Sequence, residues 1–113
     1  VFLNNTKAEL HDSFWSGAAD FVVEIASPYD ETWKKIPFYE KLGVRELLIV
    51  DRKPWKLELY RHDMRKLALA ASVGPGEAAI ECAMVPLRLS LHGGGDRPEF
   101  VVEHTLSDRK WTF

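Results

Sequence analysis

Cysteine is scarce in this 113-residue sequence, which has only Cys82. A single cysteine cannot form an internal disulfide, so nothing favours an oxidising compartment, and we expect a cytoplasmic protein. Long hydrophobic runs are absent as well. No stretch approaches the roughly 20 apolar residues of a membrane-spanning helix, so we expect a protein that does not span a membrane.

Two further absences remove familiar chemistries. The four histidines are too scattered to supply the ligand spacing of a zinc site, and Cys82 has no cysteine partner and is expected to be a buried thiol. The glycine-rich segment at residues 92–96 (HGGGD) lacks the Lys-Ser/Thr pair of a phosphate-binding loop. This segment is therefore predicted to connect two strands of a hairpin.

The overall composition is that of a globular protein. Hydrophobic residues make up 46% and charged residues 28% of the chain, whose length suits one domain. The small net charge of −2 hides an asymmetry. Residues 34–66 contain ten basic and five acidic residues, and the rest of the chain carries −7. Such a segment can attract an anionic polymer, although a solvated helix and hairpin would have the same composition.

The hydrophobic pattern predicts strands around one helix. Residues 20–26 (DFVVEIA) form a nearly continuous apolar run, typical of a strand buried on both faces. A helix is expected over 31–42, with Asp30 as its N-cap, Pro37 as a kink and Gly43 as its C-terminal stop. Further strands are expected at residues 46–51, 55–61, 67–72, 85–91 and 100–104, with Trp111 in a terminal strand or turn. The run over 46–51 (ELLIVD) is again typical of a buried strand, and the alternation over 55–61 suits an antiparallel neighbour. We therefore predict an α/β (α+β) fold with a mixed sheet.

Strand and helix periodicity point to three side chains. On the strand over 20–26, alternation places Asp20 and Glu24 on the same face, where buried acids are costly unless they are paired or coordinate a cation. On the helix, Lys35 falls in the middle of the apolar stripe and is expected to point toward the sheet, with Tyr39 beside it as a core residue. Lys34 and Trp33 are expected on the opposite, polar face. Glu24 and Lys35 could form a catalytic pair or a buried structural salt bridge.

The distance between the two acids limits their roles. Four residues of extended strand separate Asp20 from Glu24 by about 13 Å, too far to share one ion unless the strand bends. Glu24 is the stronger candidate for a metal ligand, because it is central in the strand and nearest to the helix that follows. Asp20 is a candidate second ligand or supporting acid, but it could instead hold an upstream backbone amide.

The segment over residues 18–61 resembles the Uma-two family of restriction endonucleases, within the PD-(D/E)XK nuclease superfamily. The resemblance rests on the order and spacing of an acid, Val-Glu, Ser-Pro, a helix with Lys four residues before Tyr, Gly-Val, an acid and Val-Asp. The sequence supplies them as Asp20, Val23-Glu24, Ser27-Pro28, Lys35, Tyr39, Gly43-Val44, Glu46 and Val50-Asp51.

The resemblance implies a restriction-endonuclease-like domain that hydrolyses phosphodiester bonds of DNA with Mg²⁺, or Mn²⁺, as cofactor. It implies that Glu24 and Asp20 hold the metal and that Lys35, moved from the strand to the helix, activates or steers the attacking water. Residues 1–113 would be one domain that lacks its N-terminal helices and first strands. A family acid expected on an earlier strand would then precede Val1.

The basic segment would face the phosphate backbone, and its candidate contacts are Lys34, Lys41, Arg52 and Lys53. Nucleases of the superfamily often act as dimers, so a homodimer is one arrangement that the resemblance allows. The alternative function is that of a catalytically inactive fold relative, which binds nucleic acid or protein.

Overall fold

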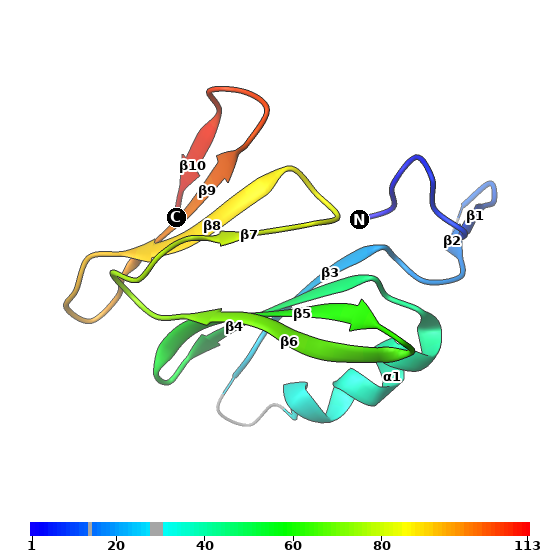
Figure 1. Cartoon of the computed structure of the whole chain (residues 1–113), viewed down its shortest axis with the longest axis horizontal. Helices are drawn as coiled ribbons and strands as arrows, with labels where there is room; N and C mark the ends of the chain where they lie inside the picture. Colours follow the sequence, from blue (N-terminus) through cyan, green and yellow to red (C-terminus); the bar gives the residue numbers. More distant parts are fainter. Residues whose placement is uncertain (14, 28–30) are drawn as a thin grey trace.

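Two four-stranded sheets and one short helix make up most of the chain (Figure 1). The computed structural model describes residues 1–13, 15–27 and 31–113. The elements in chain order are β1 (Glu9–Leu10), β2 (Trp15–Ser16), β3 (Phe21–Ile25), the 3₁₀ helix η1 (Thr32–Lys35), α1 (Ile36–Leu42), β4 (Glu46–Arg52), β5 (Trp55–Asp63), β6 (Lys66–Val73), β7 (Ile80–Glu81), β8 (Leu87–His92), β9 (Glu99–His104) and β10 (Lys110–Thr112).

The first sheet has the strand order β3-β4-β5-β6. Strand β3 pairs with β4 in parallel, and β4, β5 and β6 are joined antiparallel. A parallel pair needs a crossover connection, and η1 and α1 supply it on one face of the sheet. The predicted mixed sheet with one main helix and additional antiparallel strands is confirmed.

The second sheet, of order β10-β9-β8-β7, is antiparallel and covers the opposite face of the first (Figure 1). Buried side chains from both sheets form one apolar cluster between them. From the first sheet these are Phe21, Leu48, Val50, Leu57 and Leu59; from the second sheet and its loops they are Ile80, Val85, Leu89 and Leu91. The alternate residues Leu47 and Ile49 face α1 in a second cluster. Strand β4 is therefore buried on both faces, as its sequence predicted.

Strand β3 differs from its prediction. It was expected to be buried on both faces, but the side chains of Val23 and Ile25 are 50% and 61% exposed. The reason is its position at the edge of the sheet, where it pairs only with β4 among the described strands and where Val23 and Ile25 line an open cavity with Phe100 and Phe113. Only Phe21, at the start of β3, reaches the cluster between the sheets.

The helical segment also differs from its prediction. Instead of one helix with a kink, four residues of 3₁₀ helix precede a seven-residue α-helix. Pro37 occupies the first turn of α1, where its missing N–H leaves no hydrogen bond unmade, so no kink is required. Gly43 ends the helix in the left-handed conformation (φ +86°), as expected. The expected N-cap, Asp30, lies outside the described residues.

The remaining strands follow the predicted order. Residues 93–98 connect β8 and β9 as a hairpin, and Trp111 lies in the terminal strand β10. The short strands β1, β2 and β7 were not expected from the sequence. Within the described residues, no helix has the length and apolar character needed to cross a membrane.

Replacement of Leu57 by Ala tests the cluster between the sheets. Leu57 is fully buried, so Leu57→Ala should lower the free energy of unfolding by about 2–5 kcal/mol through lost burial and the cavity left behind. The matched control is Leu69→Ala on β6, whose side chain is exposed and which should change stability by less than about 0.5 kcal/mol. Urea unfolding measures both. Equal losses for the two variants would contradict the assigned core.

Candidate functional site

Glu24 lies in the middle of β3, on the face of the first sheet that carries α1. The parallel register pairs it with Ile49 of β4, and alternation turns Val22, Glu24 and Ala26 to the same side. Ala26 is buried in the cluster that includes Ile36 and Tyr39 of α1. Its small side chain therefore allows the helix to lie close to the sheet beside the Glu24 carboxylate.

Lys35 reaches Glu24 from the last residue of η1. Its Nζ lies 3.5 Å from Oε2 of Glu24, and the two side chains are 44% and 18% exposed. The hydroxyl of Tyr39 donates a hydrogen bond to the other carboxylate oxygen, Oε1. The structure thus brings together Glu24 and Lys35, which the sequence had paired, and adds Tyr39, which was expected only as a core residue.

Further contacts anchor the helical segment over the sheet. Oε1 of Glu40 accepts a hydrogen bond of 2.9 Å from the backbone N–H of Leu67 on β6. The indole N–H of Trp33 donates to Oε1 of Glu58 on β5 at 2.7 Å. Because Lys35 lies between these two anchors in the chain, its backbone is held at both ends of the segment that places it over Glu24.

Trp33 was predicted to lie on the polar face of a helix, away from the sheet, and this prediction is wrong. The predicted angles assume 100° per residue, whereas a 3₁₀ helix turns by about 120° and superimposes residues i and i+3. Trp33 therefore shares a side with Ile36, which packs on the sheet.

Glu58 is a site residue that the sequence analysis missed. Its side chain is buried, and its Oε2 lies 3.8 Å from Nζ of Lys56. The register pairs Ile49 with both Glu24 and Glu58, so the two acids lie in one row across the sheet, about 10 Å apart. Alternation in β5 does put Glu58 on one face with Lys56 and Tyr60, but no sequence signal indicates that this face carries the helix.

The charge of Glu58 also affects its neighbour Tyr60. Burial raises the pKa of the Tyr60 hydroxyl, and the charge of Glu58 raises it further.

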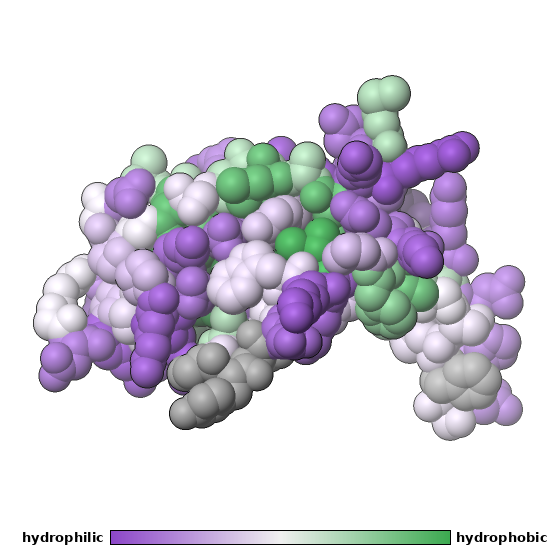
Figure 2. All heavy atoms as spheres, turned by 90° about the horizontal axis from the view of Figure 1, so that it is seen from below, coloured by the Kyte–Doolittle hydropathy of each residue, from purple (hydrophilic) through white to green (hydrophobic). Residues whose placement is uncertain are grey.

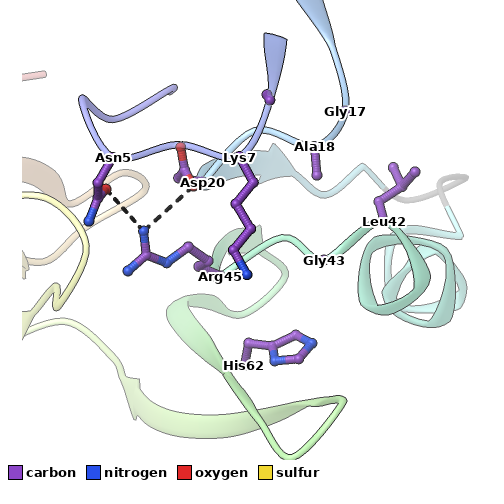
Figure 3. A pocket seen from close by; sticks show the side chains of 10 residues that line it. Asn5, Lys7, Gly17, Ala18, Asp20, Leu42, Gly43, Arg45 and His62 are labelled. Atoms are coloured by element: carbon purple, nitrogen blue, oxygen red, sulfur yellow. Dashed lines mark hydrogen bonds and ion pairs between the residues drawn. The ribbon is translucent and has the colours of Figure 1, made fainter.

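Asp20 lies at the other end of β3 and contacts a different set of groups (Figure 3). Its Oδ2 accepts a hydrogen bond of 2.8 Å from the backbone N–H of Leu3, and its Oδ1 lies 3.7 Å from a guanidinium nitrogen of Arg45. Burial raises the pKa of Asp20, but hydrogen bonds from Leu3 and Thr6 and the charge of Arg45 outweigh it, so the net pKa is lowered. The structure does not bring Asp20 to Glu24, and its role as a metal ligand stays a prediction.

The four candidate nucleic-acid contacts are spread over the chain. Lys34 is exposed and pairs with Glu31 at 2.9 Å, and Lys41 lies in the last turn of α1. Arg52 and Lys53 lie together in the β4–β5 hairpin, where they line one cavity. Seen from the side of α1, hydrophilic side chains cover much of the surface, with hydrophobic atoms between them (Figure 2).

The Cys82 thiol and the Glu46 carboxylate lie in surroundings that favour a structural role over a catalytic one. Burial and the charge of Glu46 raise the pKa of the Cys82 thiol to about 12, although Arg61 lowers it, so the thiolate nucleophile is scarce. The carboxylate of Glu46 is fully buried and accepts hydrogen bonds from the backbone N–H groups of Ala83 and Met84 and from Arg61. Glu46 therefore ties β4 to the loop between β7 and β8 of the second sheet.

The described residues near Lys35 offer a metal ion one carboxylate, that of Glu24. Within the ranges that the structure describes, no group of three or more His, Cys, Asp and Glu side chains could hold one. Mg²⁺, however, is often bound through one or two carboxylates together with water and substrate phosphate. Glu24, which is partly exposed, fits the role of such a single protein ligand.

The candidate site is defined by a mixed sheet and its helical crossover, which places Lys35 against the carboxylate of Glu24 on β3. The family model Uma2, "Putative restriction endonuclease", matches residues 1–92, so the chain belongs to this family. The match ends with β8, and β9 and β10 lie beyond it. No curated protein gives a significant match to the chain.

Replacement of Asp20 by Asn should lower the free energy of unfolding at neutral pH by about 1.5–3 kcal/mol, the usual contribution of a hydrogen bond to a charged group. The folded pKa lies below the ordinary value of 3.8, so the extra stability of the parent is present above pH 3.8 and lost as pH falls through the folded pKa.

Urea unfolding of the parent and Asp20→Asn, repeated from neutral to acidic pH, measures the difference in stability. The difference in the free energy of unfolding between parent and variant should become smaller as the pH falls below 3.8. The control is Asp12→Asn, whose parent side chain is exposed and which should leave stability nearly unchanged. A difference for Asp20→Asn that stays constant with pH would contradict the assigned contacts.

Proposed function

We propose that this chain hydrolyses phosphodiester bonds of DNA in a Mg²⁺-dependent reaction, with Mn²⁺ as a substitute ion, and that Glu24 and Lys35 carry the chemistry. The observation that carries the proposal is the 3.5 Å contact between Lys35 Nζ and Glu24 Oε2 at a partly exposed junction of helix and sheet. Membership of the restriction-endonuclease family supports the same chemistry.

In this reaction, a water oxygen bonds to phosphorus and gives up a proton to solvent, the bond from phosphorus to the leaving sugar oxygen breaks, and that oxygen takes up a proton from solvent. The Lys35 ammonium places positive charge where the phosphate and the attacking water meet, which stabilises the negative charge that develops there. Because Lys35 also contacts Glu24, the carboxylate holds the ammonium in place until a substrate arrives.

Glu24 would hold the metal ion through its carboxylate, and the ion, when bound, would supply Lewis-acid polarisation of a phosphoryl oxygen. Tyr39 donates a hydrogen bond to Oε1 of Glu24 and so fixes the orientation of the carboxylate. The proposal assigns Asp20 no place in this set, because it precedes β3, about 13 Å along the strand from Glu24, where the backbone N–H of Leu3 and the Arg45 guanidinium hold its carboxylate.

Contact with the phosphate backbone is assigned chiefly to Arg52 and Lys53. They are the two candidate cations that lie together, in the hairpin that follows β4. Lys34 is already paired with Glu31, and Lys41 lies at the far end of α1. The contact would be salt-dependent and independent of sequence.

Replacement of Glu24 or Lys35 by Gln tests the assignment. Each variant keeps the approximate shape of its side chain but loses the charge, and each should reduce plasmid nicking in Mg²⁺ by about 10²–10³-fold, the usual loss when one stabilising group is removed. The matched controls are Glu99→Gln and Lys110→Gln, which alter exposed residues of the second sheet and should nick at the parent rate.

If Glu24→Gln and Lys35→Gln cut as fast as the controls, the site is wrong. If no protein cuts but all bind DNA, the chain is the inactive binding relative instead.

Replacement of Tyr39 by Phe isolates the support of Glu24. The variant keeps the ring that packs on the sheet but loses the hydroxyl, so the Mg²⁺ concentration for half-maximal nicking should rise by about 10–100-fold. The rate at saturating Mg²⁺ should change much less. A Mg²⁺ titration of parent and variant measures both quantities, and an unchanged Mg²⁺ requirement would contradict the role of Tyr39. The chain has two other tyrosines, Tyr29 and Tyr60. Because Tyr29 lies outside the described residues, the matched control is Tyr60→Phe, on the neighbouring strand β5.

A further inference from the structure

A cavity of about 690 Å³ is lined by residues that lie close in the chain to Glu24 and to Lys35. Its described lining residues come from four segments: Ala26 and Ser27 after β3, Trp33 of η1, Asp51, Arg52, Lys53 and Trp55 of the β4–β5 hairpin, and Asp96 before β9. Ala26 is two residues beyond Glu24, and Trp33 is two residues before Lys35. The volume is within the range of about 300–1,000 Å³ that is usual for small-molecule sites.

Two tryptophans line this cavity, and both are held in place. The indole N–H of Trp33 donates to the buried carboxylate of Glu58, while the ring remains 38% exposed. Trp55 packs against the apolar cluster between the two sheets. Aromatic rings that are fixed before binding lose little conformational entropy when a ligand packs on them.

The charges of the cavity indicate what kind of ligand it suits. Its described lining has two basic residues, Arg52 and Lys53, and two acidic ones, Asp51 and Asp96. A site for a phosphate alone would have an excess of positive charge. A nucleobase is instead uncharged, has flat apolar faces that stack on aromatic rings, and has hydrogen-bond donors and acceptors at its edge.

We propose that this cavity binds an unpaired nucleobase next to the phosphodiester bond that is cut. The inference rests on the proposed nuclease function and specifies its substrate class as single-stranded or locally opened nucleic acid. In an intact duplex both faces of a base are stacked on its neighbours, so the base would have to leave the stack before it could enter. Arg52 and Lys53, which are exposed, would contact the flanking phosphates.

Binding without cleavage tests the proposal. In the absence of divalent metal, the affinity of the chain is measured for a short oligothymidylate and for an abasic oligomer of the same length, which keeps the phosphates and lacks the bases. The parent should bind the abasic oligomer about 5- to 150-fold more weakly, as expected for loss of base stacking. A duplex with the same thymidylate strand should also bind more weakly than the single strand.

The tryptophan variants locate the effect. Trp33→Ala should bind both oligomers with similar affinity, whereas Trp111→Ala, which removes a comparably exposed ring (40%) from β10, should keep the preference of the parent. A second measurement leaves the cavity intact. In a chain with Trp15→Phe and Trp111→Phe, the remaining fluorescence comes from Trp33 and Trp55, and oligothymidylate but not the abasic oligomer should quench it.

Equal affinity of the parent for the two oligomers, or equal quenching by them, would overturn the cavity assignment. These results are distinguishable from failure of the proposed function. If the chain nicks DNA but binds both oligomers equally well, the cavity assignment is wrong and the proposed nuclease function stands. If binding depends on the bases but no nicking occurs, the cavity assignment stands and the proposed nuclease function is wrong.

Discussion

The parallel pairing of β3 with β4 is the constraint on which the candidate site depends. Two parallel neighbours cannot be joined by a tight turn, so the chain must cross one face of the sheet between residues 25 and 46. That crossover brings Lys35 over Glu24 and Tyr39 beside it. The pairing also gives β4 its two buried faces, because the helix covers one and the second sheet covers the other.

Buried carboxylates connect several segments that are distant in the chain. The groups that each carboxylate contacts indicate whether its role is structural or chemical. Asp20, Glu46 and Glu58 accept hydrogen bonds from backbone or indole N–H groups, which satisfies their oxygens and ties separate segments together. Glu24 differs, because its partners are a partly exposed lysine and a tyrosine hydroxyl on the helix. A partly exposed acid with a partly exposed lysine beside it is better placed to exchange partners with a ligand than one held by backbone amides.

Much of the fold could be predicted because its signals are local. The apolar run of β4, the alternation of β5 and the left-handed stop at Gly43 each follow from a few neighbouring residues. The errors arose where a local signal depends on distant cover. The apolar residues Val23 and Ile25 look buried in sequence, but an edge strand leaves them exposed. The 3₁₀ geometry of η1 likewise turned Trp33 toward the sheet, against the angles of an α-helix.

For the site, the sequence by itself determined the pairing of Glu24 with Lys35, because strand and helix periodicity each specify a face and the short crossover brings the two faces together. Only the tertiary structure decided that Asp20 binds the Leu3 amide and Arg45 instead of joining that pair. Only it placed Glu58 in the same row of the sheet and Trp33 on Glu58. The physical reason is that register and strand order set which side chains meet across a sheet, and neither is encoded in the spacing of residues along one strand.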